Sequence, residues 1–348
     1  MTGTPLKLKN LTKRFGRVTA VEGINLEVQG GELVAFLGPS GCGKTTTLLM
    51  IAGIYRPTEG EIYFGDRRVD HLHPKDRDVG MVFQSYALYP HLTLFENIAF
   101  PLRLKRFSEA MIRERVQKTA DLLGIGKILD RKPAQVSGGQ QQRAALARAL
   151  VKEPQVLLLD EPLSNLDTQI RLSARAEIRR LQQNLGVTSI LVTHDQAEAL
   201  AMADRVAVFS TGRLQQYDPP EVLYQSPKNT FVAGFVGSPP MNLIEGEFTA
   251  DGFKRGAFQI PIPGAPIGKG WLGVRPEHLT LSAEGIPAKV MVVETLGREF
   301  LVVLDAHGVR LQALIPEGQK PAVNAEVRIK IPPERPHYFD AQGLRIGP

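Results

Sequence analysis

A glycine-rich segment, residues 38–45, has the residue types needed to hold a polyphosphate. It matches the pattern G-x-x-x-x-G-K-[ST] and consists of Gly38, Pro39, Ser40, Gly41, Cys42, Gly43, Lys44 and Thr45. The glycines allow backbone N–H groups to converge on phosphate oxygens, and a following helix adds its positive end. The Lys44 ammonium would neutralise the outer phosphates, and the Thr45 hydroxyl would bind Mg²⁺. The segment therefore predicts a nucleotide site, which we extend to Thr46. Cys42 is expected to contribute its backbone and no redox chemistry.

A pair of carboxylates follows a short apolar run at residues 156–159. Asp160 ends the run and is expected to reach Mg²⁺, directly or through water. Its neighbour Glu161 would act as the general base that polarises an attacking water. The alternative role for Glu161 is that of a helix-capping or ion-paired carboxylate. The pair predicts that the bound nucleotide is hydrolysed.

A second candidate anion site precedes a later helix. It consists of Ser137, Gly138, Gly139 and Gln140. These residues offer a hydroxyl, glycine N–H groups and a helix N-terminus. The glycine-rich segment at residues 38–45, a P-loop, already provides one phosphate site, and the chain does not need another for the same nucleotide. We therefore expect this site to serve the nucleotide of a second copy, which predicts a two-fold dimer.

Four short apolar runs are expected to position these residues. They are residues 33–37, 79–83, 156–159 and 189–193, and they are followed by Gly38, Gln84, Asp160 and His194. Short and nearly unbroken runs are typical of strands buried on both faces of a mostly parallel sheet. Ligands of open α/β sheets bind at the carboxyl ends of the strands. The runs therefore predict one site along a single sheet edge.

A helical insert is expected between the second and third runs, from about residue 85 to residue 152. Ser108 can cap one helix, which Gly124 stops. A second helix is expected to begin after Gly139 and to run to Val151. The insert predicts a helical subdomain set into the sheet.

The last third of the chain has the pattern of β structure. Three β-branched runs, at 289–293, 300–304 and 326–331, are broken by Gly and Pro and favour a small OB-type barrel. We place the main boundary near Gly237. The predicted domains are thus an α/β P-loop domain over residues 1–236 and an all-β domain over residues 237–348.

Composition limits the class of protein further. The 348 residues are 43% hydrophobic and 22% charged, which is typical of a soluble globular protein with two or three domains. One cysteine argues against a disulfide scaffold, and no run of about 18 apolar residues predicts a membrane span. The N-terminal segment lacks the apolar core of a signal peptide. These features predict a cytosolic protein.

The segment Val136–Gln140 resembles the signature sequence of ATP-binding cassette (ABC) ATPases, about 20 residues before the Asp160 strand. This resemblance implies a homodimer that sandwiches two ATP molecules, each P-loop facing Ser137 of the other copy. It also implies roles for four further residues. Phe15 would stack on adenine, unless it is an ordinary strand aromatic. Gln84 would contact Mg²⁺ and the attacking water, Asp167 would belong to the loop that crosses the dimer interface, and His194 would sense the γ-phosphate.

Longer segments resemble carbohydrate-importer ATPases of the maltose and glycerol-phosphate type. They are residues 85–105, 193–209, 231–246 and 273–279. The resemblance implies that the OB-like domain is regulatory and helps to hold the dimer together. It also implies that the helical subdomain docks onto integral-membrane permease subunits at the cytoplasmic face of the inner membrane, with an extracytoplasmic substrate-binding protein as an indirect partner. We expect no catalytic role for residues 275–277.

Two alternatives remain for the process that ATP hydrolysis drives. Importers of polyamines, iron and sulfate share the same layout as the carbohydrate importers. Nucleic-acid or ribosome-associated ABC proteins are the more remote alternative, which the basic net charge of +6 favours. Against it, Ser137 lies only 93 positions after Lys44, which leaves no room for a long coiled coil, and the chain has one cassette. Residues 236–348 also hold 12 basic and 12 acidic residues, so the OB-like domain is neutral. We expect no nucleic-acid partner.

Overall fold

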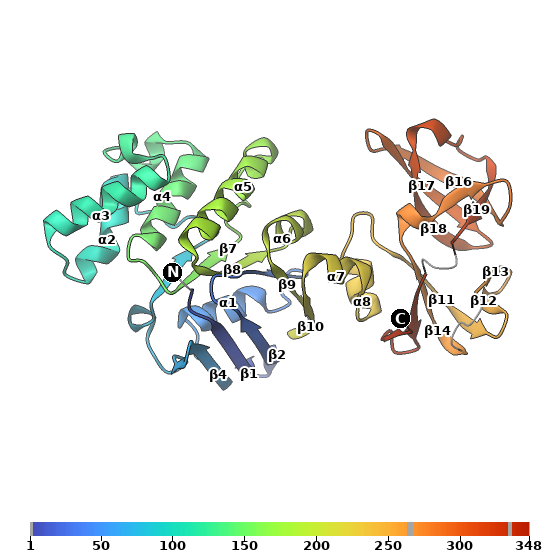
Figure 1. Cartoon of the computed structure of the whole chain (residues 1–348), viewed down its shortest axis with the longest axis horizontal. Coiled ribbons are helices and arrows are strands. Elements are labelled where there is room, and N and C mark those ends of the chain that lie inside the picture. The colour runs from blue at the N-terminus through green and yellow to red at the C-terminus, as the bar shows by residue number, and fades with distance from the viewer. Residues whose placement is uncertain (1–2, 263–266, 333–335, 348) are drawn as a thin grey trace. The chain divides into compact units, whose positions relative to one another are not determined.

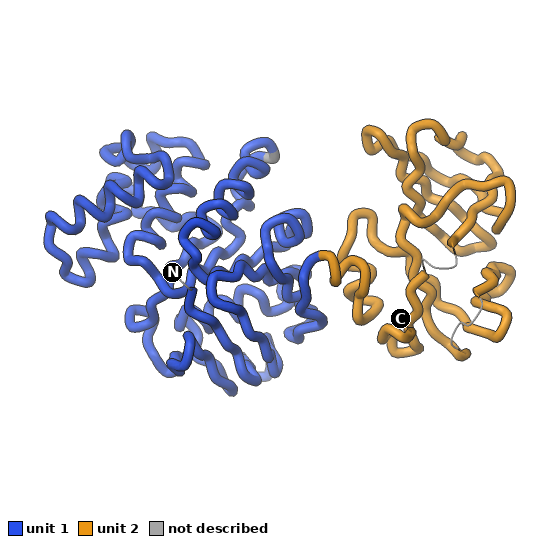
Figure 2. The backbone as a smooth tube through the Cα atoms, viewed as in Figure 1, with its two compact units in different colours: residues 1–220 blue, residues 221–348 orange. Residues whose placement is uncertain are grey.

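The computed structural model describes residues 3–262, 267–332 and 336–347 of the chain. It divides into two compact units, residues 1–220 and residues 221–348 (Figure 2). The domain boundary predicted near Gly237 lies beyond this division, within the second unit. No helix in the described ranges is long and apolar enough to cross a membrane.

The first unit contains the predicted, mostly parallel sheet. Its strands are β3 (Leu33–Leu37), β6 (Val79–Val82), β7 (Val156–Asp160), β8 (Thr188–Thr193), β9 (Arg205–Ser210) and β10 (Arg213–Asp218), in the order β10-β9-β3-β8-β7-β6. The first five strands run parallel, and β10 is antiparallel to β9. Leu37 pairs with Thr193, and Asp160 pairs with Val192. The strand ends that were predicted to share an edge therefore do so.

A second, antiparallel sheet lies in the same unit and was not predicted. Its order is β2-β1-β4-β5, with β1 (Leu6–Phe15), β2 (Val18–Val28), β4 (Glu59–Phe64) and β5 (Arg67–Arg68). One buried apolar cluster joins both sheets through helix α1 (Lys44–Ala52). Leu8 of β1, Leu48 of α1 and Phe36 of β3 all belong to it. Helix α1 is thus packed between the two sheets.

Arg77 fixes the carboxyl end of α1. Its side chain is 1% exposed, and its Nη1 donates to the carbonyl oxygens of Met50 (2.6 Å) and Ile51 (2.9 Å). Burial lowers the pKa of the guanidinium to about 10, so it stays charged at neutral pH. A cation at this end also complements the helix dipole. Together these contacts hold the helix whose other end begins at the P-loop.

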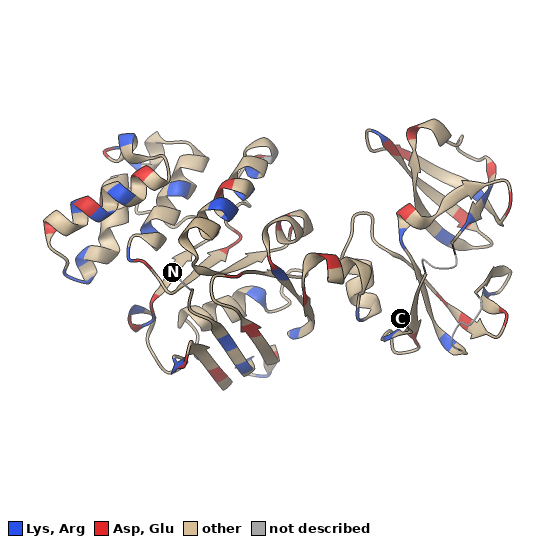
Figure 3. Ribbon diagram, viewed as in Figure 1, with Lys and Arg blue, Asp and Glu red and all other residues tan. Residues whose placement is uncertain are grey.

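The helical insert consists of α2 (Leu94–Leu104), α3 (Glu109–Leu122) and α4 (Gly138–Leu150) (Figure 1). Ser108 caps α3 as predicted, by accepting a hydrogen bond from Met111 N–H. Acidic and basic residues lie along α3 (Figure 3), whereas Ile112, Val116 and Ala120 form its buried stripe. Helix α4 begins at Gly138, two residues earlier than predicted, because Ser137 is its N-cap.

Two more helices complete the first unit beside the parallel sheet. Helix α5 (Thr168–Leu185) follows β7, and helix α6 (Gln196–Met202) follows β8. Each begins with an aspartate cap, Asp167 for α5 and Asp195 for α6. Short 3₁₀ turns lie at Pro74–Asp76, Gly126–Ile128 and Pro133–Gln135. The sequence patterns did not predict these two helices.

The second unit is mainly β, as predicted. After helices α7 (Pro220–Gln225) and α8 (Thr230–Phe235), one sheet has β11 (Asn242–Thr249), β12 (Gly252–Arg255), β13 (Phe258–Pro261), β14 (Gly268–Val274), β20 (His337–Asp340) and β21 (Arg345–Ile346). The other sheet has β15 (Thr280–Ser282), β16 (Ile286–Thr295), β17 (Glu299–Ala306), β18 (Val309–Pro316) and β19 (Glu326–Lys330). The two sheets share one apolar core, in which Phe248 and Val302 are members. Strands β16, β17 and β19 confirm the three predicted β-branched runs.

Candidate active site

The P-loop, residues 38–45, joins β3 to the amino end of α1, and its backbone carbonyls bind the Lys44 side chain. Lys44 is 6% exposed, and its Nζ donates to the carbonyl oxygens of Gly38 (2.7 Å) and Pro39 (2.8 Å). Gly43 has φ +102°, and a Cβ there would lie 2.7 Å from the carbonyl oxygen of Ala20. Only glycine fits this conformation and this close approach. Cys42 is buried inside the loop, with its Sγ 3.7 Å from the Lys44 Nζ.

The candidate Mg²⁺ ligands lie side by side at the start of α1 and the end of β7. Thr45 Oγ1 donates to Asp160 Oδ1 at 3.2 Å. Burial raises the pKa of Asp160, and the neighbouring Glu161 raises it further, while the Thr45 hydrogen bond and Lys44 oppose the shift. A divalent cation would supply the opposing charge that this half-buried carboxylate lacks.

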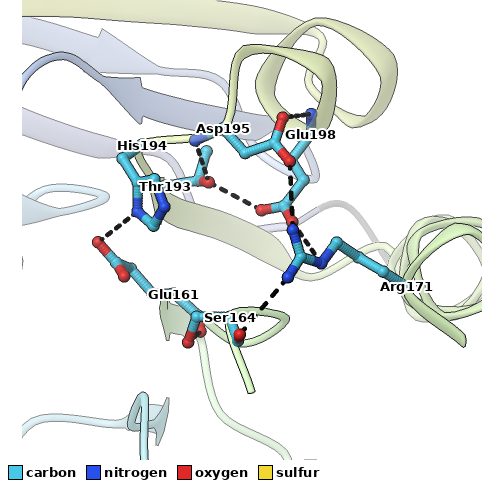
Figure 4. Close-up of a pocket in the computed structure, with 7 residues that line it drawn as sticks. All are labelled: Glu161, Ser164, Arg171, Thr193, His194, Asp195 and Glu198. Atoms are coloured by element: carbon cyan, nitrogen blue, oxygen red, sulfur yellow. Dashed lines mark hydrogen bonds and ion pairs between the residues drawn. The ribbon is translucent and has the colours of Figure 1, made fainter. Parts of the chain in front are cut away.

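The Glu161 carboxylate is held between residues from two other strand ends. Its Oε2 accepts a hydrogen bond from Gln84 Nε2 at 2.9 Å, and its Oε1 lies 3.1 Å from His194 Nδ1 (Figure 4). Glu161 has φ +44°, a conformation that non-glycine residues seldom adopt. Its N–H donates to Val192 O at 2.9 Å, which holds the turn against β8. The structure thus brings together Gln84, Glu161 and His194, as the sheet edge predicted.

The candidate signature site is the exposed amino end of α4. Ser137 Oγ accepts from Gln140 N–H at 3.3 Å, and Gln140 Oε1 accepts from Ser137 N–H at 3.0 Å. This reciprocal capping box sets the geometry of the helix start. Ser137 and Gly138 are exposed. An anion could therefore approach the dipole of α4 from outside this chain.

Residues 164–167 connect Glu161 to helix α5. Asp167 is exposed, and its Oδ1 accepts from Ile170 N–H at 3.0 Å as the N-cap of α5. Asn165 Nδ2 donates to Gln84 O at 2.6 Å, so this segment also contacts the end of β6. The predicted interface role of Asp167 remains a prediction.

Phe15 lies at the exposed tip of the β1–β2 hairpin, with 43% of its surface accessible. Its ring meets Tyr55 edge-on at 5.3 Å between centroids, and Lys13 Nζ lies 4.9 Å from its centroid. From the tip, β2 leads directly to Ala20 beside the P-loop. An exposed ring next to the P-loop is compatible with stacking on a base, which stays a prediction.

Comparisons with known proteins identify families and relatives that this chain resembles. Residues 21–164 match the family described as ABC transporter, residues 237–279 match the MalK OB fold domain, and residues 272–339 match the TOBE domain. The chain is 46% identical over 361 residues to the trehalose/maltose import ATP-binding protein MalK of Thermococcus litoralis, covering 96% of this chain and 97% of that protein. It is 47% identical over 313 residues to the sn-glycerol-3-phosphate import ATP-binding protein UgpC of Bordetella avium, covering 88% and 86%.

This chain belongs to the ABC transporter family.

Membership of the ABC transporter family confirms the predicted fold and the predicted enzyme class. As an ABC ATPase, the protein binds ATP and couples its hydrolysis to transport. Among solved structures, it resembles the ATP-binding cassette MJ0796, a dimer in a post-hydrolysis state bound to ADP and Pi. The two are 33% identical with a TM-score of 0.55, covering 62% of this chain and 98% of that one. The OB fold and TOBE matches confirm the predicted OB-like character of the last third.

Three contacts of this ABC ATPase site were not anticipated from sequence. Gln142, only 3% exposed on α4, donates to Pro162 O at 3.1 Å. Asn165 binds the backbone of Gln84, and Arg171 contacts the 164–167 segment. All three side chains bind backbone carbonyls; Gln142 and Asn165 reach segments 20 and 81 residues away, whereas Arg171 reaches carbonyls seven and five residues before it. No sequence pattern identifies such partners, because any residue can supply a backbone carbonyl.

Proposed function

We propose that this protein is the ATP-hydrolysing subunit of an importer for a sugar or a related carbohydrate, working with a substrate-binding protein. The observation that carries the proposal is the Glu161 carboxylate, held by Gln84 and His194 at the sheet edge that also bears Lys44 and Asp160. The import of trehalose, maltose and glycerol phosphate named for its relatives supports the substrate class. Specificity within that class would rest on permeases and the binding protein.

The residues present fit a magnesium ion that is held partly by the nucleotide. Within the described ranges, no group of three or more His, Cys, Asp or Glu side chains forms a complete metal site. The Thr45 hydroxyl and the Asp160 carboxylate are hard oxygen ligands placed together, and Gln84 can add its amide oxygen. Mg²⁺ is commonly bound by few protein ligands together with substrate phosphates, and there it would offset phosphate charge.

The proposed reaction follows from the contacts of each side chain. When ATP enters, the Lys44 ammonium exchanges the carbonyls of Gly38 and Pro39 for phosphate oxygens. Glu161 then takes a proton from the attacking water, and Gln84 and His194 hold its carboxylate in position. His194 is exposed enough to contact the γ-phosphate as well. Loss of that phosphate removes the anion that favours closure.

The exposed start of α4 supports a two-fold ATP sandwich, in which Ser137 of one copy faces the P-loop of the other. The dimeric state of the related cassette MJ0796 is compatible with this arrangement. The helical subdomain would dock on permease subunits at the cytoplasmic face of the membrane. Closure of the sandwich would then be passed to the permeases through the segment after Gln84.

The sandwich and the role of Glu161 can be tested with one variant. Glu161→Gln should retain ATP binding, lose hydrolysis and remain as a stable dimer when ATP is added. Light scattering after gel filtration measures the mass with and without ATP, and Glu114→Gln, an exposed glutamate on α3, is the matched control. A variant that stays monomeric with ATP, or that hydrolyses ATP at the wild-type rate, would show that the role is misassigned.

The importer assignment needs a separate experiment. The tagged protein is purified from mildly solubilised membranes, and the co-purifying chains are identified by mass spectrometry. We expect one or two multispanning permeases, whose substrate-loaded binding protein should stimulate ATP hydrolysis. Recovery with ribosomal proteins or nucleic acid instead would reject the transport role while leaving the ATPase site intact.

A further inference from the structure

A small cavity of about 60 Å³ lies beside the Glu161–His194 pair and is closed on its other side by charged residues of α5 and α6 (Figure 4). We propose that Arg171 of α5 is a positioning residue, which links the 164–167 segment to Asp195 and so keeps Glu161 and His194 aligned. The inference rests on the proposed hydrolytic function. It adds a residue that does not itself contact the nucleotide.

The Arg171 guanidinium contacts both loops that lead to the reacting groups. Its Nη2 donates to Leu166 O at 3.1 Å and lies 3.5 Å from Ser164 O. Its Nη1 lies 3.7 Å from Asp195 Oδ2. Arginine suits this role because its planar fork can bind a carboxylate and carbonyl oxygens at the same time.

Each contacted segment is fixed in turn to a member of the reacting pair. Ser164 Oγ donates to Glu161 O at 2.9 Å, and Ser164 N–H donates to the same oxygen at 3.2 Å. On the other side, Asp195 directly follows His194, and its N–H donates to Thr193 Oγ1 at 3.0 Å. The contacts form a closed ring from Glu161 through Ser164, Arg171 and Asp195 to His194.

Charged residues of α5 and α6 also fix the position of Asp195 and of the residues next to it. Glu198 is 3% exposed, and burial raises the pKa of its carboxyl, although the hydrogen bond from Thr193 and the nearby Arg175 and Arg171 lower it. Thr193 Oγ1 donates to Glu198 Oε2 at 2.7 Å. Arg175 Nη2 donates to Asp195 Oδ2 at 2.8 Å, which anchors Asp195 to α5 one turn after Arg171.

Arg171 differs from Arg175 in the segments that it joins. Arg175 forms ion pairs with Asp195 and Glu198, whereas Arg171 contacts Asp195 and also the carbonyls of the 164–167 segment. The Nε of Arg171 is buried without a hydrogen bond and lies 4.0 Å from Glu198 Oε1. A shift of the 164–167 segment would therefore change the contacts of Arg171 directly and displace the residue next to His194.

The test compares ATP turnover of full-length variants. For Arg171→Met we expect kcat to fall about 10- to 100-fold with KM for ATP within about twofold, because misalignment affects the reacting groups and not nucleotide binding. Arg171→Lys should retain intermediate turnover, since a lysine supplies the charge without the fork. Arg180→Met, an exposed arginine on the same helix, is the matched control and should behave as wild type.

A double-mutant cycle tests the link to Asp195. Asp195→Asn keeps the α6 cap, because asparagine caps as well as aspartate, but removes the charge. If both residues act in one ring, Arg171→Met combined with Asp195→Asn should reduce kcat no further than the worse single variant.

Three results would overturn the positioning role. The first is Arg171→Met with turnover within about twofold of wild type. The second is a double variant whose loss is the product of the single losses. The third is a fall in kcat matched by a rise in KM and a lower melting temperature, which would show a general structural defect. A wild-type protein without ATPase activity would instead reject the proposed function itself, and the positioning role with it.

Discussion

Charged side chains occupy the edge of the parallel sheet in residues 1–220 and the interior beside β14 in residues 221–348, and they are bound in different ways. At the sheet edge, the Glu161 carboxylate binds the side chains of Gln84 and His194. In the second unit, Arg275 donates to the carbonyl oxygens of Val236 (2.5 Å) and Tyr224 (2.7 Å).

Exposure separates the two places as well. His194 retains 59% of its side-chain surface, whereas Arg275 is 1% exposed and lies 3.9 Å above the Tyr224 ring. Burial lowers the pKa of Arg275, and burial together with Glu277 raises the pKa of Tyr224 to about 12. Glu161 and His194 bind one another through partly exposed side chains and can therefore exchange partners for a ligand, whereas the Arg275 guanidinium and the carbonyls that it binds are enclosed within the folded unit. The first arrangement is therefore suited to chemistry and the second to holding α7 and α8.

The largest expected effect is on catalysis at the sheet edge. His194→Ala should lower kcat for ATP about 100-fold, because Glu161 loses a partner and, in the proposed mechanism, the γ-phosphate loses a contact. The melting temperature should hardly change, since the imidazole is mostly exposed. Steady-state ATPase assays measure the effect, with the exposed His71→Ala as control. Normal turnover in His194→Ala would make this residue an ordinary surface histidine.

A smaller effect, on stability alone, is expected in the second unit. Arg275→Met should lower the free energy of unfolding by about 2–3 kcal/mol, because it leaves buried carbonyls unpaired. ATP turnover per folded molecule should not change. Trp271, the single tryptophan of the sequence, lies on β14 and packs with Met241 and Phe339, so its fluorescence during urea unfolding reports on this unit. The exposed Arg310→Met is the control. If Arg275→Met unfolds like the control, the buried contacts contribute no stability.

The smallest effect is a pH dependence of the same unit. Burial, with Arg345, Arg275 and His278 nearby, lowers the pKa of His337 from 6.5 to about 4. The folded form therefore disfavours the proton, so the contribution of neutral His337 to the free energy of unfolding is complete above pH 6.5 and is lost as the pH falls toward 4. Trp271 fluorescence should show unfolding at lower urea concentration across this range. His337→Gln should flatten that dependence, and an equally steep curve in the variant would assign the effect to other groups.

Much of the first unit was predictable because its strands and caps carry local signals. Strand β3 was predicted with its observed bounds, since all five of its residues are apolar and buried. Helix α3 was predicted from Ser108 and its spaced apolar residues. Strand β1 has a signal too, because Leu6 and Leu8 alternate with Lys7 and Lys9. No local sequence signal shows that β1 pairs with β2 and β4, since strand partners depend on tertiary packing.

The candidate site likewise contains residues that the sequence predicted and residues that it did not. Lys44, Asp160, Glu161 and His194 follow apolar strands, so their shared edge followed from the rule for parallel sheets. The roles of Arg171 and Gln142 depend on backbone carbonyls of other segments, and any residue can supply a carbonyl. The contacts of Arg275 were equally unpredictable, because the sequence does not reveal which carbonyls the guanidinium binds. Residues 275–277 were expected only to have no catalytic role.

The turn at residues 161–165 holds the helical subdomain at two points. Asn165 binds Gln84, where the chain leaves the sheet for the subdomain, and Gln142 of its last helix binds Pro162. A rigid rotation that preserves both hydrogen bonds must have its axis close to this turn. Displacement grows with distance from an axis, so α2 and α3 could travel far while Glu161 barely moves. A displacement of a fraction of an ångström at the Glu161 carboxylate would then accompany a much larger displacement of α2 and α3.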